Sequence, residues 1–456
     1  MLKLVRRIKV HQNLLVLVAV ALQGVALVQA QFTPPIENYP PGSYRADNQN
    51  WAIDQAENGL LFIANQSRIL IFDGNRWQSE FVPGSQNVRK LRVVGDRLYV
   101  GGSMSAGSFE ITSKGLTDFK AIQGLEQQSI AVGEEFWEII SHRDQLFFQS
   151  KTAIYRIQDH RVVEKKSFLS DRPEGFEAEQ MLYFFGSQGA SLKYSSLGFE
   201  ILSSDSLDAP IVGQYVINDQ RFFIDERSLS YRIADRKLLK SEQQLLTIED
   251  ENRLYDLVQI ESGLIMAGTI ASGLQVFDTA GKQLYSLSRR TGLLNNTVLT
   301  LFESRSHRVW LGLDQGIASF APATNLLAYR YGFDDLGVVY TAIQHQGILY
   351  IGTNQGLYRY QSSSDSFQFI EQTRGQVWDL KVLHNKLYCF HDKGLFEVSG
   401  LKASQISSAT GFWTAEPFEV ELNPSYILGG YDGVYRYTEG SAPEKIEGFD
   451  VSSRFL

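Results

Sequence analysis

The sequence contains little cysteine and little proline, and it has only one long apolar run. Its single cysteine, Cys389, excludes an internal disulfide and a zinc site built from several thiolates. Only 11 prolines stand against 38 glycines, 28 phenylalanines and 21 tyrosines, a balance typical of β-strands joined by tight turns. With 43% hydrophobic and 21% charged residues, the composition predicts a globular chain and excludes disorder, collagen and coiled coil.

Local catalytic motifs are also absent from the sequence. It has no Gly-x-Ser-x-Gly elbow, no phosphate-binding Gly-Lys-Ser/Thr loop and no His-Glu-x-x-His metal pair. The seven histidines are scattered, so we expect them to be structural or solvated, and we expect neither a metal nor a cofactor. The sequence does not exclude a pair of catalytic carboxylates. It has 51 acidic residues, and the two partners of such a pair can come from distant segments.

The one apolar run lies near the N-terminus, at residues 14–28, and basic residues precede it. Together with the small-residue exit before residue 31, this pattern predicts a signal peptide over residues 1–30, cleaved near Ala30. An uncleaved membrane anchor is the alternative, but Gln23 and Gly24 interrupt a run already shorter than the ~20 apolar residues of a spanning helix. We therefore expect a periplasmic or exported protein whose mature chain has no membrane span.

The charge of the chain bears on its partners. The formal net charge is −8, and removal of the basic leader makes the remaining chain more acidic. Affinity for nucleic acids depends largely on Lys and Arg that neutralise phosphates. We therefore expect no direct binding of nucleic acid.

An internal repeat dominates the rest of the sequence. Each copy has an apolar strand, a glycine, a short polar turn and a second strand rich in aromatics, and each glycine is expected to supply the positive φ of a turn. Ten copies recur about every 41 residues between Phe62 and Ile427, a period typical of four-stranded propeller blades. The three best copies are residues 309–320 (VWLGLDQGIASF), 349–360 (LYIGTNQGLYRY) and 387–398 (LYCFHDKGLFEV).

The repeat predicts an all-β fold of four-stranded β-propeller blades. Ten blades exceed the usual four to eight of a single ring, so we expect one seven-bladed ring plus a partial second ring. The first propeller is assigned to residues 31–320, and an incomplete second one of about three blades to residues 321–456. Residues 448–456 (GFDVSSRFL) are expected to begin an eleventh blade, as in a truncated product.

A row of aromatic residues supplies the candidate site. Each opens a short strand that precedes a repeat core and that we interpret as the innermost strand of its blade, so the row is predicted to gather at a channel mouth. Flat aromatic faces beside polar groups suit sugar or peptide ligands, although aromatics at this position also pack between blades. The candidate ligand-binding residues are Trp51, Trp137, Tyr255, Tyr340, Trp378 and Trp413, with Asn50, Asp256 and Asp379 beside them.

Two stretches carry a family resemblance. Residues 292–303 (GLLNNTVLTLFE), followed by 309–317 (VWLGLDQGI), resemble the repeat of bacterial two-component regulator propellers. Residues 48–53 (NQNWAI) and 59–65 (GLLFIAN) resemble the start of the exported sensor region in regulators of the triple-tyrosine and LuxR type or in hybrid histidine kinases. The resemblance implies propellers outside the inner membrane that sense a ligand or assemble with partners, with a homodimer expected for the full-length regulator.

In that family, a triple-tyrosine module and a membrane helix connect the propellers to a kinase or DNA-binding module. None of these modules follows the repeats in this sequence. The resemblance therefore implies the periplasmic ligand-sensing or partner-binding region of a signal-transduction or transcription regulator, without its output module and without enzyme activity. Two alternatives stay open: an exported propeller enzyme, such as a polysaccharide lyase or glycosidase, and a structural interaction scaffold.

Overall fold

The computed structural model describes residues 32–103, 105–125, 134–204, 207–234, 237–241, 246–248, 253–324, 326–329, 336–363, 366–418 and 425–454. The predicted signal peptide and its cleavage site lie outside these residues. Two compact units are present: a seven-bladed unit, Phe32–Arg330, and a three-bladed unit that includes Tyr331–Leu456. Within the described residues, no helix is both long enough and apolar enough to cross a membrane.

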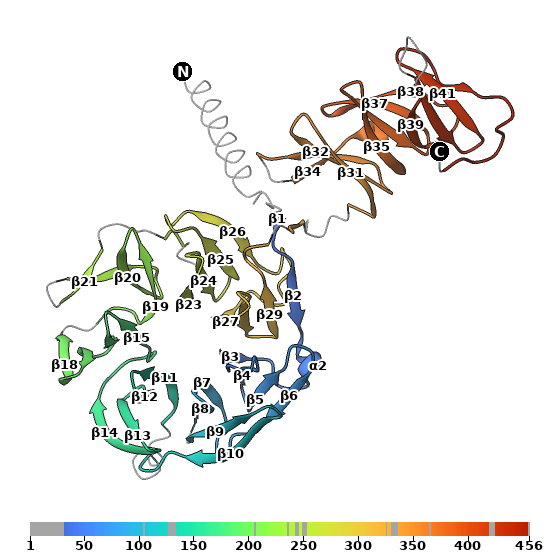
Figure 1. Ribbon diagram of the computed structural model, residues 1–456. Helices are drawn as coiled ribbons and strands as arrows, with labels where there is room; N and C mark the ends of the chain where they lie inside the picture. Colours follow the sequence, from blue (N-terminus) through green and yellow to red (C-terminus); the bar gives the residue numbers. More distant parts are fainter. Residues whose placement is uncertain are drawn as a thin grey trace, which may run out of the picture. The chain divides into compact units, whose positions relative to one another are not determined.

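Six blades of the seven-bladed unit are four-stranded antiparallel arrangements continuous in sequence, and one parallel pair, Gly213 with Leu257, joins the inner strands of two of them (Figure 1). Their strands are β3 (Asn50–Gln55), β4 (Leu61–Asn65), β5 (Arg68–Phe72), β6 (Trp77–Glu80); β7 (Val88–Val94), β8 (Arg97–Gly102), β9 (Ala106–Thr112), β10 (Gly115–Ala121); β11 (Phe136–His142), β12 (Gln145–Ser150), β13 (Ala153–Gln158), β14 (Arg161–Ser167); β15 (Gly175–Ala178), β16 (Met181–Phe184), β17 (Ser191–Ser195), β18 (Gly198–Ser203); β19 (Ile211–Ile217), β20 (Gln220–Asp225), β21 (Ser230–Ala234), β22 (Lys237–Lys240); β23 (Leu254–Gln259), β24 (Ile265–Thr269), β25 (Leu274–Phe277) and β26 (Gln283–Leu287).

The seventh blade joins the two ends of the unit. Its first three strands are β27 (Val298–Glu303), β28 (Val309–Leu313) and β29 (Ile317–Phe320), and its outer strand is β2 (Ile36–Tyr39) from the N-terminal side. Strand β2 pairs antiparallel with β29, with Ile36 opposite Phe320 and Tyr39 opposite Ile317. A short pair, β1 (Phe32–Thr33) with β30 (Ala328–Tyr329), and the helical turn α2 (Pro41–Tyr44) complete the unit. The ring is therefore closed by strand pairing between segments at the two ends of the unit.

The core lies between the blades. One cluster of buried side chains joins Met266 and Leu274 of the sixth blade to Leu311 and Phe320 of the seventh. Figure 1 shows the blades around one axis, with the first strand of each innermost. The predicted all-β propeller, with a seven-bladed ring and a partial second ring, is confirmed. Each blade has two apolar faces, and burying them against neighbouring blades is what the hydrophobic effect favours.

The three-bladed unit has the same blade design. Its strands are β31 (Val339–His345), β32 (Ile348–Thr353), β33 (Leu357–Gln361), β34 (Ser366–Phe369); β35 (Val377–Leu383), β36 (Lys386–His391), β37 (Gly394–Ser399), β38 (Lys402–Ser407); and β39 (Phe412–Phe418), β40 (Ser425–Gly430), β41 (Val434–Thr438), β42 (Glu444–Lys445), with one 3-10 turn, η2 (Glu371–Thr373). The expected eleventh blade does not begin in the described part of the tail. Residues 446–454 form no strand there, and the Ser453 amide donates a hydrogen bond to the Gly430 carbonyl at 3.1 Å.

The two repeat glycines have different roles. Gly316 has φ 96°, as expected for a turn, whereas Gly312 lies inside β28 without a positive φ. A Cβ atom at Gly312 would lie 2.5 Å from the Asn50 carbonyl oxygen and 2.6 Å from Cγ2 of Thr300. The expectation of turn geometry was therefore wrong for Gly312, which instead allows the first blade's inner strand to approach the seventh blade closely.

This contact makes Gly312→Ala a test of blade packing. We expect the substitution to lower the free energy of unfolding by about 1–3 kcal/mol, because an added methyl group must push the neighbouring backbone away. Urea unfolding of the full chain measures the effect. Gly42→Ala is the matched control, since a Cβ atom at Gly42 meets nothing within 4 Å. Equal unfolding midpoints for the two variants would contradict the packing role.

Candidate functional site

The predicted aromatic row has a structural cause, a bulge near the start of each inner strand. In every blade except that of β15, pairing between the first and second strands shifts by one residue at the second position of the first strand. A β-bulge leaves one residue unpaired and changes the direction of its side chain. All six predicted aromatics occupy this position: Trp51, Trp137, Tyr255, Tyr340, Trp378 and Trp413.

In the seven-bladed unit, three of these aromatics line one axial pocket with two arginines. The rings of Trp51 and Trp137 meet edge to face, with centroids 6.3 Å apart. The Arg89 guanidinium lies 4.1 Å from the Trp51 ring centroid and 5.0 Å from that of Trp137. The Arg172 guanidinium lies 3.7 Å from the centroid of Tyr255. The arginines therefore already occupy part of the aromatic surface by cation–π contact.

Half-buried ion pairs also line the axial pocket. Lys90 pairs with Glu138 at 2.9 Å and Arg172 with Glu174 at 2.8 Å. Burial raises the pKa of Glu174 to about 7, although Arg172 and Lys90 act in the opposite direction. Burial also raises the pKa of Asp256, whose carboxylate accepts a 2.7 Å hydrogen bond from the Leu301 amide of the next blade. Asp256 therefore lines the pocket and also ties two blades together.

The pocket is small, and the two indole rings that line it have N–H groups without an acceptor among the described residues. Its volume is about 60 Å³, which is space for about two water molecules. The indole Nε1 atoms of Trp51 and Trp137 are shielded from solvent and have no hydrogen-bond partner in the part of the chain that the structure describes. Buried donors of this kind are costly unless something accepts from them. The Arg89 and Arg172 guanidinium groups also line the pocket, so it suits the tip of a ligand that carries hydrogen-bond acceptors.

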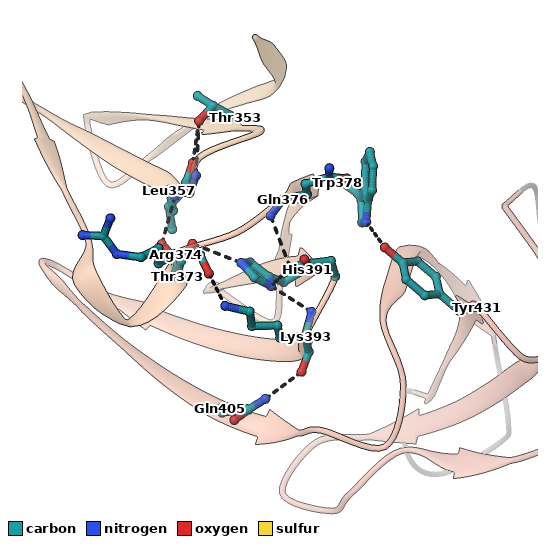
Figure 2. Close-up of polar contacts among 12 residues, drawn as sticks. Thr353, Leu357, Thr373, Arg374, Gln376, Trp378, His391, Lys393, Gln405 and Tyr431 are labelled. Atoms are coloured by element: carbon teal, nitrogen blue, oxygen red, sulfur yellow. Dashed lines mark hydrogen bonds and ion pairs between the residues drawn. The ribbon is translucent and has the colours of Figure 1, made fainter. Parts of the chain in front are cut away.

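In the three-bladed unit, the predicted aromatics form a continuous row. Tyr340 stacks on Trp378 with centroids 5.2 Å apart, Trp378 lies 4.7 Å from Trp413, and Trp413 lies 4.8 Å from Tyr431. Figure 2 shows Trp378 directed toward Tyr431, to whose hydroxyl its indole N–H donates at 2.6 Å. Tyr340 and Tyr431 are 43% and 36% exposed, so the row reaches the surface.

A buried histidine binds the turn that precedes the strand of Trp378. The His391 imidazole donates through Nε2 to the Thr373 carbonyl at 3.0 Å and accepts through Nδ1 from the Lys393 amide at 2.9 Å (Figure 2). Burial lowers the pKa of His391, although the Asp392 carboxylate, whose Oδ1 lies 2.7 Å from Nδ1, acts in the opposite direction. The role of His391 in this arrangement is therefore structural.

Two predicted polar residues are used in joining blades. Asn50 has no exposed surface, and its amide donates to the Gly316 carbonyl at 2.8 Å and accepts from Asn65 at 3.0 Å. Asp379 accepts from the Thr414 hydroxyl at 2.6 Å and from its neighbour Leu380. The structure thus places Asn50 in the contact between the first and seventh blades, outside the residues that line the axial pocket, whereas Asp379 ties together two blades of the three-bladed unit.

Sequence reasoning did not select four charged residues of the axial pocket: Arg89, Lys90, Arg172 and Glu174. Arg89 occupies the same bulge position as the selected aromatics, so this register could have found it. Arg172 and Glu174 precede β15, the inner strand that lacks the bulge. No signal in the repeat pointed to them.

One group of described residues has the composition of a metal site. Glu261, Glu303 and His307 place their ligand atoms within 4.8 Å of one another. His307 pairs with Glu261 at 3.3 Å and with Glu303 at 3.4 Å, and its side chain is 63% exposed. Acidic groups at the surface commonly lie this close together without holding an ion, so the group carries no metal assignment.

Comparison with known proteins defines what the chain resembles. No family model and no curated protein matches it. The extracellular domain of a hybrid two-component system from B. thetaiotaomicron superposes with a TM-score of 0.65 at 14% identity, covering 91% of this chain and 60% of that chain. The chain has the fold of this extracellular domain. The match supports the resemblance of the repeats to two-component regulator propellers, and the chain spans 60% of that domain's length.

Two further solved structures have lower scores. The extracellular domain of a second hybrid two-component system from the same organism gives a TM-score of 0.49 at 16% identity, covering 92% of this chain and 62% of that chain. PorZ, a surface component of the type-IX secretion system of Porphyromonas gingivalis, gives 0.45 at 11% identity, covering 92% and 61%.

Proposed function

We propose that this chain is the periplasmic, ligand-sensing propeller region of a signal-transduction regulator, exported by cleavage near Ala30. In this proposal its ligand is an oligosaccharide or another small molecule rich in hydrogen-bond acceptors, and the output module lies outside this sequence. One observation carries the proposal. Bulges on separate inner strands bring Trp51, Trp137, Tyr255 and Arg89 together at the axis of the seven-bladed unit, beside Arg172 from the segment before β15.

The geometry supports recognition of a ligand's end. The pocket admits only a small group, and the Arg89 and Arg172 guanidinium groups beside its aromatic faces carry N–H donors beyond those paired with Glu135 and Glu174. Hydroxyl and carboxylate oxygens accept from such donors. In a ring of blades, the axis is also the place where side chains from several blades meet, so a ligand there contacts more than one blade.

The test is binding of an array of oligosaccharides to the full chain. We expect a bound member whose affinity falls about tenfold or more in Trp137→Ala and less in Trp137→Phe, which keeps a ring but loses the N–H donor. Trp77→Phe is the control, because Trp77 lies on an outer strand away from the axis. Binding that is unchanged in Trp137→Ala would contradict the proposed site.

A propeller glycosidase is the second candidate function, and one observation favours it. Glu174, with a pKa of about 7, and Asp256, with a raised pKa, line the same pocket, and a glycosidase needs one carboxyl group kept protonated near neutral pH. Against it, Glu174 is paired with Arg172 and Asp256 is bound to the Leu301 amide. Hydrolysis of a bound oligosaccharide that disappears in Glu174→Gln would replace the sensor proposal by this one.

A further inference from the structure

A second pocket lies at the seam where β2 closes the ring. It has a volume of about 320 Å³, within the range of roughly 300–1,000 Å³ usual for small-molecule sites. Its walls come from three segments far apart in sequence: β2 with Glu37 and Tyr39, the first blade with Phe72 and Asp73, and the seventh blade with Arg308 and Trp310. All of these residues belong to the seven-bladed unit.

Aromatic rings form one side of this seam pocket. Tyr39 stacks on Trp310 with centroids 5.6 Å apart and an interplanar angle of 15°. Phe72 meets Trp310 edge to face at 5.7 Å and Tyr39 at 5.6 Å. Phe72 and Trp310 are mostly buried, and both line the pocket as a rigid apolar wall.

Opposite charges enter the seam pocket from different blades. Arg308 donates through Nη2 to Glu37 at 2.9 Å and to the Ser319 hydroxyl at 2.8 Å, and its fork carries further N–H donors. Asp73 accepts through Oδ1 from the amides of Asn75 at 2.8 Å and Arg76 at 2.6 Å. Its second oxygen, Oδ2, is then available to a ligand. One guanidinium, paired with Glu37, and a second carboxylate, that of Asp73, therefore line the same cavity as the aromatic wall.

We propose that the seam pocket binds a free α-amino acid with an apolar side chain. The carboxylate of the amino acid binds Arg308, and its ammonium group binds Asp73. Its apolar side chain packs against Tyr39, Phe72 and Trp310. Glu37 and Asp73 disfavour phosphates and dicarboxylates through like-charge repulsion, and a neutral ligand would use neither charge. A zwitterion with an apolar side chain matches all three features of the pocket.

Binding at this place is coupled to closure of the ring. Glu37 and Tyr39 belong to β2, so the complete pocket exists only when β2 is paired with β29. A ligand that binds only this state stabilises it by mass action. The site therefore connects the concentration of a small molecule to the state of the strand at the N-terminal side of the propeller.

The first experiment measures calorimetric binding and thermal stability of the full chain with L-leucine and L-phenylalanine. We expect both to bind and to raise the melting temperature. N-acetyl-L-leucine lacks the ammonium group and L-leucinamide lacks the carboxylate, so each is expected to bind about tenfold more weakly or worse. Absence of binding by both amino acids, or equal binding of the blocked forms, overturns the proposal. Binding of neutral hexoses in their place overturns the ligand class.

Matched variants then locate the site. Asp73→Asn keeps an oxygen for the turn amides but loses the charge, and we expect about tenfold weaker binding. Its control is Asp278→Asn, because Asp278 caps the corresponding turn of the sixth blade through the amides of Ala280 and Lys282. Ser306→Trp is expected to fill the pocket, whereas Ser262→Trp alters the same turn of the sixth blade. Amino-acid binding that survives in Ser306→Trp overturns the location.

Discussion

A chain that begins at residue 40 is expected to unfold at a much lower temperature than one that begins at residue 34. Both lack β1, but only the shorter chain lacks β2 and therefore the outer strand of the seventh blade. Removal of β2 leaves the edge of β29 unpaired and removes the Tyr39 ring that stacks on Trp310. The loss of a large buried aromatic side chain alone costs about 3–5 kcal/mol. In a unit of this size, such a loss lowers the melting temperature by roughly 6 °C or more.

Calorimetry of the two truncated chains measures this difference. Tyr39→Ala in the longer chain separates the side-chain contribution from the backbone pairing, because β2 then keeps its hydrogen bonds to β29. We expect this variant to lie between the two truncations in stability. If both truncated chains melt at the same temperature, strand β2 does not close the ring in solution.

The repeat was readable in the sequence because each blade meets the same requirements. An apolar strand must fill the space between blades, and a small residue such as Gly312 must let the next inner strand approach. These requirements recur about every 41 residues and leave a visible period. Closure of the ring leaves no such trace, since β2 has only four residues and its partner β29 is far away in sequence.

Only part of the candidate site could be predicted from the sequence, because only residues at a repeated position stand out. Trp51 and Trp137 were found because aromatics stand out at a repeated position. Arg89 shares that position, but from sequence alone an arginine is expected to be exposed to solvent. The structure instead places its guanidinium over the rings of Trp51 and Trp137. The repeat pattern did not predict the seam pocket. Asp73 and Arg308 line the same pocket only because the first and last blades lie side by side in the closed ring.

The stability of the wild-type chain is expected to fall, relative to that of Glu174→Gln, as pH rises from about 4.5 to about 7. Burial raises the pKa of Glu174 from 4.5 to about 7, so the folded chain keeps a proton that the unfolded chain releases in this range. Folding is then favoured below pH 4.5, and this advantage is lost as pH rises through 7. The shift corresponds to about 3 kcal/mol for this side chain, which is 17% exposed.

Urea midpoints of both chains between pH 4.5 and 8 test this prediction. A neutral glutamine resembles the protonated carboxyl group, so the two chains should agree at low pH, and Glu174→Gln should be the more stable above pH 7. Glu164→Gln is the matched control, because Glu164 pairs with Arg156 at 3.0 Å but is 38% exposed. Asp256 also has a raised pKa, so some pH dependence should remain in Glu174→Gln. Parallel curves for all three chains would mean that Glu174 titrates as a solvated residue and that the axial pocket is open to water.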